Sequence, residues 1–162
     1  MLILDVDGVL TDGRIIYDEF GDELKHFDVQ DGAGLVLWRR EGLKTAVITA
    51  RNSKLVARRA KELQVDHLIQ KAVDKRRAYD AVLKRLRLKP EEACAVGDDL
   101  MELPMLRQSG LAVAVANAVP EVKAACQYVT QRAGGRGAVR ETIELILKAQ
   151  GRWDAIVSRY SS

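Results

Sequence analysis

The stretch LILDVDG at residues 2–8 is the most informative part of the sequence, because it joins an apolar run to two carboxylates. The run is continuous rather than alternating, which is typical of a strand buried on both faces of a parallel sheet. Residues two apart on a strand point to the same face, so Asp5 and Asp7 can converge on one ligand, and Gly8 lets the backbone turn. Two such carboxylates repel each other unless a cation lies between them, and Mg²⁺ suits oxygen ligands. Taken alone, the pattern also fits a strand that ends in an aspartate-capped turn.

The alternation of strands and helices along the chain predicts the fold class. Similar apolar runs are TAVIT at 45–49, ACAVG at 93–97, LAVAV at 111–115 and, more weakly, HLIQ at 67–70. Segments at 53–63 and 74–87 place apolar residues at helical spacing between these runs. This order is typical of an α/β protein with a Rossmann-like open parallel sheet and helices on both faces.

Residues 11–27 interrupt this alternation. RIIYD, EFGDE and LKHF indicate two short strands around a Gly21-Asp22 turn, and thus a β-hairpin inserted after the first strand. An isolated two-stranded hairpin is marginally stable in water. We therefore expect its apolar side chains to be buried against other copies of the chain in a homo-oligomer. These side chains are Ile15, Ile16, Tyr17, Leu24 and Phe27.

A single domain is expected over residues 1–150. Its last part contains a short helix in PEVKAAC, which starts at Pro120, and a glycine-rich loop that leads into a helix at 139–148. Residues 151–162 lack a strong pattern and are interpreted as a mobile tail. Trp153 in this tail is expected to pack on a neighbouring subunit.

Composition excludes several classes of protein. The chain has 162 residues, of which 48% are hydrophobic and 30% charged, so it can bury an ordinary core. A net charge of +3 is too small to indicate nucleic-acid binding, but it would not repel an anionic substrate. No apolar run approaches the roughly 18 residues of a membrane span, and Asp5 and Asp7 interrupt any signal peptide, so we expect a soluble cytoplasmic protein. Cys94 and Cys126 lie in apolar contexts and are expected to be buried and reduced.

A second acidic motif, GDD at 97–99, follows another apolar run. All strands of a parallel sheet that point the same way end at one edge, so Asp98 and Asp99 are expected beside Asp5 and Asp7. Four carboxylates at one edge are difficult to explain by a purely structural role. The sequence therefore predicts a metal site at this edge.

Two further residues extend the site toward a phosphate. Thr49 closes the run at 45–49 and offers a hydroxyl donor at the same edge, and Lys75 lies near the start of a helix. An ammonium group there can neutralise a bound phosphate. Each residue alone more often faces solvent or caps a helix. Their placement relative to the carboxylates makes the phosphate interpretation the better one.

DVDGVLTDG, ITAR, DK and GDD in this order resemble the motifs of the haloacid dehalogenase superfamily of aspartyl-phosphate phosphatases. The chain is most similar to one branch, the 3-deoxy-D-manno-octulosonate 8-phosphate phosphatases, which lack a large cap domain. The stretches that carry this resemblance are FDVQDGAGL, VITARNS, VGDDLMELPML, GLAVAVANA and GGRGAVRE. The resemblance covers nearly the whole chain. It implies a Mg²⁺-dependent phosphatase of lipopolysaccharide precursor synthesis that forms a homotetramer.

The resemblance also implies roles for individual residues. Asp5 would be the nucleophile, and Asp7 would protonate the leaving oxygen and then activate water. Mg²⁺ would be held by Asp5, Asp98 and the backbone carbonyl of Asp7. Thr49 and Lys75 would bind the oxygens of the transferring phosphoryl group.

Substrate recognition is implied for a second set of residues. They are Asp7, Asp28, Gln30, Asp31, Gly32, Arg51, Arg59 and Lys75. Arg59 lies in a basic helix that is also typical of a solvated face. Arg136 is a further candidate for a carboxylate contact, and Asp99 for a contact to a metal-bound water. The chain departs from its relatives at Gln30 and Val36, where they often carry Arg, and at Glu102, where they carry Asp.

Two alternative functions remain at this point. One is a phosphatase for a nine-carbon keto-deoxy sugar acid phosphate, which the missing arginines leave open. The other is a non-catalytic oligomerising module of the same fold. The chain nevertheless has all four sites that carry chemistry, which are DVDG at 5–8, Thr49, Lys75 and GDD at 97–99. A phosphate-accepting signalling domain is disfavoured because DVDG follows the first strand rather than a middle one.

Overall fold

A computed structural model describes residues 1–161 of the chain. Six strands form one parallel sheet in the order β5-β4-β1-β6-β7-β8. The strands are β1 (Leu2–Leu4), β4 (Thr45–Ile48), β5 (His67–Ile69), β6 (Cys94–Gly97), β7 (Leu111–Ala114) and β8 (Tyr128–Val129). The predicted α/β fold is confirmed, including the weak strand at 67–70. Only β8 has no counterpart in the prediction, because two residues are too few for a recognisable apolar run.

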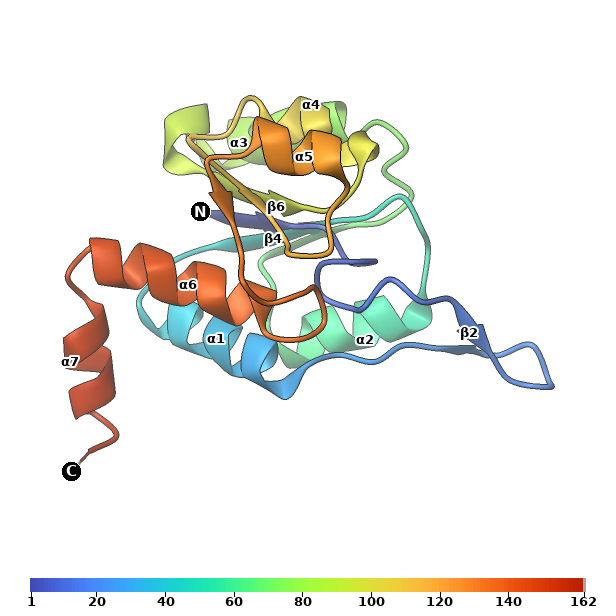
Figure 1. The fold of residues 1–162 in the computed structure, drawn as a ribbon, viewed down its shortest axis with the longest axis horizontal. Coiled ribbons are helices and arrows are strands. Elements are labelled where there is room, and N and C mark those ends of the chain that lie inside the picture. Colours follow the sequence, from blue (N-terminus) through green and yellow to red (C-terminus); the bar gives the residue numbers. More distant parts are fainter. Residues whose placement is uncertain (162) are drawn as a thin grey trace.

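Helices cover both faces of this sheet (Figure 1). They are α1 (Val29–Arg40), α2 (Lys54–Glu62), α3 (Lys75–Leu86), α4 (Leu103–Leu106), α5 (Pro120–Ala125), α6 (Ala138–Ala149) and α7 (Trp153–Ser158), with 3₁₀ turns η1 (Pro90–Glu92) and η2 (Leu100–Glu102). α1, α2 and α6 lie on one face, and α3, α4 and α5 lie on the other (Figure 1). Across residues 1–161 no helix is long and apolar enough to cross a membrane.

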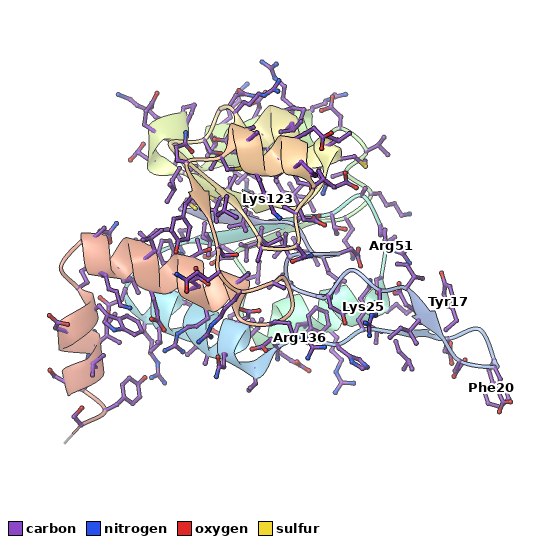
Figure 2. The ribbon with its side chains drawn as sticks, viewed as in Figure 1. Tyr17, Phe20, Lys25, Arg51, Lys123 and Arg136 are labelled. Atoms are coloured by element: carbon purple, nitrogen blue, oxygen red, sulfur yellow. The ribbon has the colours of Figure 1, made fainter. Side chains whose placement is uncertain are left out.

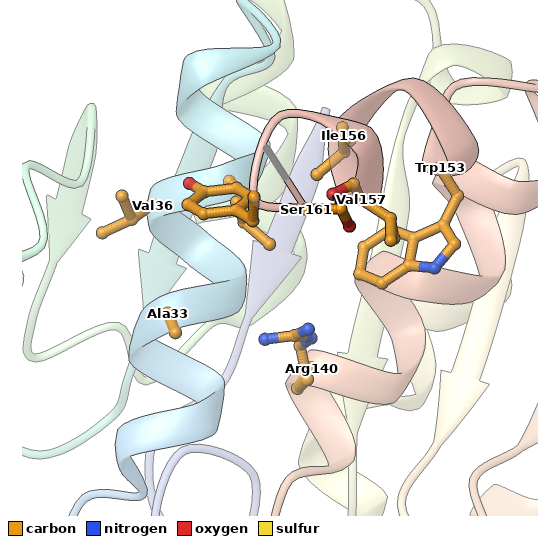
Figure 3. A pocket seen from close by; sticks show the side chains of 9 residues that line it. Ala33, Val36, Arg140, Trp153, Ile156, Val157 and Ser161 are labelled. Carbon is orange, nitrogen blue, oxygen red and sulfur yellow. Dashed lines mark hydrogen bonds between the residues drawn. The ribbon is translucent and has the colours of Figure 1, made fainter.

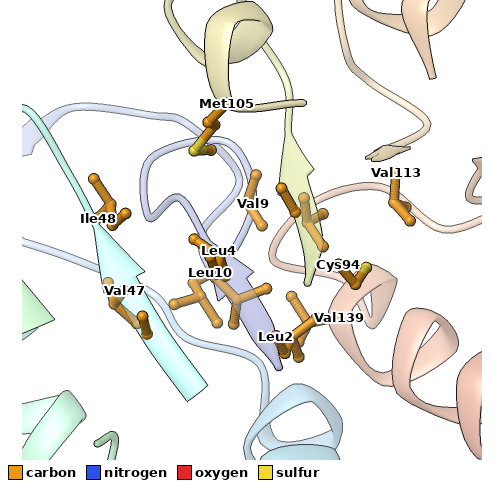
Figure 4. Close-up of a cluster of buried hydrophobic side chains, with 14 of the residues drawn as sticks. Leu2, Leu4, Val9, Leu10, Val47, Ile48, Cys94, Met105, Val113 and Val139 are labelled. Carbon is orange, nitrogen blue, oxygen red and sulfur yellow. The ribbon is translucent and has the colours of Figure 1, made fainter. Parts of the chain in front are cut away.

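The core lies on both sides of β1, which explains why its sequence is continuously apolar. Leu2, Ile3 and Leu4 are completely buried, and side chains from β4, β6, β7 and α6 surround them (Figure 4). Full burial of one such side chain contributes about 1.5–3 kcal/mol. Cys94 is buried here as predicted, and burial raises the pKa of its thiol to about 12. The prediction was wrong for Cys126, which is only partly buried at the end of α5.

The predicted hairpin is present as a separate two-stranded sheet. Strands β2 (Ile16–Tyr17) and β3 (Glu23–Leu24) pair antiparallel, and Gly21 takes a φ of +85° at the turn. The hairpin projects from the body of the molecule, with Tyr17 and Phe20 near its tip (Figure 2). Its exposed apolar side chains are Ile15, Tyr17, Phe20 and Leu24. Phe27 is not among them, because it packs against the core.

The C-terminal segment is a packed helix, so its interpretation as a mobile tail was wrong. Ile156 on α7 is only 2% exposed. Trp153 lies under the cationic groups of Arg140 and Lys148, at 5.3 and 5.4 Å from its ring, and thus finds its partners within its own chain. Together α1, α6 and α7 surround an apolar cavity of about 580 Å³ (Figure 3). Six residues are too short to show helical periodicity, so only packing reveals this element.

Candidate active site

The candidate site lies where the three central strands end. Leu4 of β1 pairs with Val47 of β4 and Val96 of β6. Asp5 follows β1 directly, and Asp98 and Thr49 follow β6 and β4. Strand register thus brings residues far apart in sequence to one edge, as predicted.

Three carboxylates form the centre of the site. Asp5, Asp98 and Glu102 each offer an oxygen within 4.8 Å of the others. Asp5 and Glu102 are buried, with 4% and 2% of their surface exposed. Gly8 makes room for this cluster, because a Cβ atom there would lie 1.9 Å from Oδ2 of Asp98. The sequence suggested Glu102 only for an altered contact to a metal-bound water, and its contact with Lys75 was not predicted.

Lys75 is the cation of this cluster. It begins α3, and its buried ammonium donates hydrogen bonds to Oδ1 of Asp5 at 2.6 Å and to Glu102. Burial would lower the pKa of Lys75, but Asp5 and Glu102 raise it above its usual value. The second carboxylate oxygen of Glu102 accepts from the backbone N–H of Asp99 at 2.8 Å. Glu102 therefore links Lys75 to the loop that carries Asp98.

The cluster holds more negative charge than one ammonium neutralises. Burial raises the pKa of Asp5 to about 6, although Lys75 opposes this effect. Burial, followed by repulsion from Glu102 and Asp5, raises the pKa of Asp98 to about 8. A divalent cation between these oxygens would remove the repulsion. The carboxylate oxygens of Asp5 and Asp98 are donors that Mg²⁺ prefers, so the site fits this ion.

Asp7 faces the hairpin. Its Oδ1 accepts a hydrogen bond from Lys25, and Nε of Arg51 lies 3.9 Å from its Oδ2. Glu23 joins these groups, since its carboxylate accepts from Arg51 at 2.6 Å and from Oγ of Ser53 at 2.8 Å. Lys25 and Arg51 lie near each other where the hairpin meets the body (Figure 2). Lys25 and Glu23 were missed, because alternating charges in a short strand give no sign of what they contact.

Thr49 occupies the position expected of a phosphate ligand. It is 2% exposed, and its Oγ1 accepts a hydrogen bond of 3.3 Å from the backbone N–H of Arg51. A hydroxyl group that accepts in this way keeps its own proton to donate. Thr49 can therefore donate to an anion at the strand edge.

Two acidic residues of the predicted substrate-binding segment serve the fold. Asp28 caps α1 by accepting hydrogen bonds from the N–H groups of Gln30 at 2.6 Å and Asp31 at 3.2 Å. The buried carboxylate of Asp31 accepts from the N–H groups of Gly137 at 3.3 Å and Arg140 at 2.8 Å. Burial raises the pKa of Asp31 to about 6. The resemblance implied Asp31 for substrate recognition; its buried side chain holds the start of α6, which leaves its backbone for that role.

Gly32 and Arg59 form one unit in this segment. A Cβ atom on Gly32 would lie 2.4 Å from Nη2 of Arg59, so glycine lets the arginine lie against α1. The guanidinium of Arg59 lies 5.8 Å from the ring centre of Phe27, and its buried Nε has no hydrogen-bond partner among residues 1–161. Arg59 is therefore not part of a solvated face. Its Nη1 lies 3.5 Å from Oε2 of Glu62, and about a quarter of its side chain remains exposed.

Gln30 has an unexpected partner. Its Oε1 accepts a hydrogen bond of 2.7 Å from Nη1 of Arg132, an exposed residue that the sequence did not single out. This pair lies at the start of α1. Arg132 thus places a guanidinium beside Gln30 at the start of α1. The residues around Arg132 in the sequence do not indicate this contact.

The remaining candidates lie around the same loops. Asp99 is exposed and caps η2 by accepting from the N–H of Leu100 at 2.7 Å. Arg136 is 68% exposed in its side chain and lies 3.9 Å from Asp12. The glycine-rich loop that carries Arg136 packs tightly on the DVDG loop, since a Cβ atom on Gly134 would lie 1.7 Å from the carbonyl oxygen of Gly8.

Comparisons with known proteins agree with this geometry. The sequence model of the haloacid dehalogenase-like hydrolases matches residues 40–142. The 3-deoxy-D-manno-octulosonate 8-phosphate phosphatase KdsC of Escherichia coli K12 is 46% identical over 154 residues, which cover 95% of this chain and 82% of that protein. The crystal structure of the phosphatase of the same name from Moraxella catarrhalis, in complex with magnesium, phosphate and KDO, superposes with a TM-score of 0.96 at 43% identity and covers 98% of this chain and 91% of that one. A cobalt-bound form from Haemophilus influenzae superposes with a TM-score of 0.89 at 37% identity, covering 93% and 88%.

Proposed function

The chain belongs to the haloacid dehalogenase-like hydrolase family, and we propose that it is a Mg²⁺-dependent phosphatase that hydrolyses 3-deoxy-D-manno-octulosonate 8-phosphate to the free sugar acid and phosphate. One observation carries this proposal: the carboxylates of Asp5, Asp98 and Glu102 lie together at the carboxyl edge of the sheet, and Lys75 donates to Asp5 and Glu102. The identity of 46% with an enzyme of that name supports the same substrate.

The carboxylates of Asp5 and Asp98 and the backbone carbonyl of Asp7 are the ligands that we assign to Mg²⁺. When bound, the ion neutralises phosphate charge and aligns the phosphoryl group with Asp5. Glu102 remains bonded to Lys75 and to the loop that carries Asp98, so it positions this loop rather than the substrate.

In the first step Asp5 attacks phosphorus through a carboxylate oxygen, and the bond from phosphorus to the sugar oxygen breaks. Asp7 in its protonated form donates its proton to that leaving oxygen. The products are an aspartyl-phosphate on Asp5 and the free sugar acid. Thr49 and Lys75 bind the phosphoryl oxygens as the charge on them shifts.

In the second step Asp7, now a carboxylate, removes a proton from a water molecule that attacks the aspartyl-phosphate. The bond from phosphorus to Asp5 breaks, inorganic phosphate leaves, and both aspartates return to their starting states. The same side chain therefore serves as acid and then as base.

The sugar acid is recognised by the guanidinium groups next to this centre. Arg51 lies beside Asp7, and the guanidinium of Arg59 remains partly exposed, so both suit a carboxylate or hydroxyl groups. We assign the backbone of residues 28–32 and the side chain of Gln30 to the rim of the same site. The comparisons do not favour either alternative function, which is a phosphatase for a nine-carbon keto-deoxy sugar acid phosphate or a non-catalytic module.

The exposed apolar side chains of the hairpin support a homo-oligomer, which we take to be a tetramer by resemblance. Phe20 at 84% and Tyr17 at 60% exposure are unusual in a monomer. Light scattering on the wild-type protein and on Phe20→Ser measures the assembly directly. We place the enzyme in the cytoplasm, in lipopolysaccharide precursor synthesis.

Phosphate release tests the proposal. Purified protein should release phosphate from 3-deoxy-D-manno-octulosonate 8-phosphate with Mg²⁺ and not after chelation with EDTA. The nine-carbon sugar acid phosphate, assayed in parallel, should have the lower kcat/KM. The absence of Mg²⁺-dependent release from both compounds would leave the non-catalytic module as the better assignment.

A further inference from the structure

The hairpin places one buried cation in the active site. The side chain of Lys25 is 1% exposed, although most neighbouring hairpin side chains face solvent. Its ammonium donates to Oδ1 of Asp7 and lies 3.3 Å from Oε1 of Glu23. A buried ammonium is costly unless it is paired, so these two contacts define its position.

On the basis of the proposed function, we propose that Lys25 is a positioning residue for Asp7, which it holds so that Oδ2 faces the leaving oxygen of the substrate. A lysine ammonium has only donors. Its contact with Oδ1 of Asp7 therefore leaves Oδ2 as the carboxylate oxygen that Lys25 does not occupy.

The surroundings of Oδ2 agree with this assignment. Nε of Arg51 lies 3.9 Å from Oδ2, beyond hydrogen-bond distance, so Arg51 does not occupy that oxygen. Oδ2 is therefore available to donate a proton to the sugar oxygen and later to accept one from water. Lys25 itself transfers no proton in either step.

Glu23 fixes Lys25 in turn. Its carboxylate contacts Lys25 and accepts from Arg51 and from Ser53 at the start of α2. Each hairpin strand pairs over only two residues, so this polar contact set attaches the hairpin to the body of the protein. The hairpin is thus connected to catalysis within one chain, independently of any contact between copies.

A leaving-group comparison separates positioning of the acid from a merely structural role. The bond to a sugar alcohol needs protonation as it breaks, whereas the bond to p-nitrophenol does not. The parameter kcat/KM reports the first chemical step, in which Asp7 acts as an acid. Loss of its correct orientation should therefore affect the sugar phosphate selectively.

The experiment compares wild type with Lys25→Met on 3-deoxy-D-manno-octulosonate 8-phosphate and on p-nitrophenyl phosphate. We expect kcat/KM for the sugar phosphate to fall about 30-fold or more, and kcat/KM for the aryl phosphate to change less than about threefold. Lys25→Arg keeps a donor and a charge and should recover part of the loss. Arg14→Met removes an exposed basic side chain from the same segment and should change neither value.

The possible outcomes are distinct. Equal losses on both substrates, or no loss on either, would overturn the role of Lys25 while leaving the phosphatase assignment intact. A wild-type protein that hydrolyses neither substrate would instead overturn the proposed function. Thermal unfolding checks that each variant is folded. If Lys25→Met does not fold, Lys25→Gln replaces it, because glutamine keeps a hydrogen-bond donor without the charge.

Discussion

Lys75 donates a hydrogen bond of 2.6 Å to Asp5, although the two residues are separated by 70 positions in the sequence. Both side chains are almost completely buried. The pair places an ammonium group directly beside the carboxylate that we assign as nucleophile, and Glu102 holds the ammonium from its other side. Phosphate that binds here meets a preorganised cation, and such preorganisation is a main source of catalytic power.

Asp5→Asn should abolish turnover while the fold persists. The amide has nearly the same shape but cannot form an aspartyl-phosphate, so we expect kcat to fall by at least about a thousandfold. Phosphate release measures the loss, and circular dichroism checks the fold. Asp80→Asn, on the exposed face of α3, should retain full activity. Substantial activity in Asp5→Asn would remove Asp5 as the nucleophile.

Asp98→Asn should change the response of the protein to magnesium. In wild type, Mg²⁺ at a hundred times its Kd should stabilise the fold by about 2.7 kcal/mol. The variant should lose this stabilisation by Mg²⁺. In EDTA, however, the variant should unfold at a higher temperature than wild type, because it has one negative charge fewer among the crowded carboxylates. Thermal melts with Mg²⁺ and with EDTA measure both effects. An equal Mg²⁺ response in both proteins would exclude Asp98 as a ligand.

The stability contribution of Asp31 should depend on pH. Because burial raises the pKa of Asp31 from its usual 3.8 to about 6, ionisation opposes folding as pH rises from 4 to 7. The free energy of unfolding of Asp31→Asn relative to wild type should therefore increase by up to about 3 kcal/mol over this range. Urea denaturation at pH 4 and pH 7 measures the change.

Asp66→Asn serves as a control of opposite sign for the Asp31 experiment. Partial burial opposes ionisation of Asp66, but Lys44 and the N–H of Thr45 outweigh it and hold the pKa of Asp66 below its usual value. Because the usual pKa is 3.8, its stabilising effect is almost fully present at both pH 7 and pH 4 and is lost only at lower pH. The destabilisation by Asp66→Asn should therefore be nearly equal at pH 4 and pH 7 and smaller near pH 2. Parallel pH trends for Asp31→Asn and Asp66→Asn would contradict both assignments.

Gly134→Ala should separate the glycine-rich loop from the DVDG loop. The added methyl group would meet the backbone of Gly8 at 1.7 Å, so one loop must move. We expect a loss of about 1–3 kcal/mol of stability together with reduced kcat, because Gly8 adjoins Asp7. Gly42→Ala has a positive φ of +75° and open space around it, so it should lose only about 1 kcal/mol and keep its kcat. Unchanged kcat in Gly134→Ala would show that the loop contact is not needed for catalysis.

Much of the architecture could be predicted because a strand that is buried on both faces of the sheet is recognisable as a continuous apolar run. β1, β4, β6 and β7 are continuous apolar runs, and β1, β4 and β6 lead directly into residues that form the site. In a parallel sheet these ends meet at one edge, so Asp5 and Asp98 could be placed together before any coordinates were known. Short elements such as β8 and α7 escaped prediction, because they are stabilised by packing rather than by a periodic pattern.

The sheet, the acidic edge and the family resemblance could be inferred from the sequence, because they depend on residue types at fixed local spacing. Which charged groups contact each other follows from the three-dimensional fold. Lys25 reaches Asp7 from a hairpin 18 residues away, and Glu102 turns inward to Lys75. The side chain of Asp31, which the resemblance implied for substrate recognition, instead binds the start of α6. Burial and pairing of charged side chains depend on what the fold places around them, and no local pattern encodes that information.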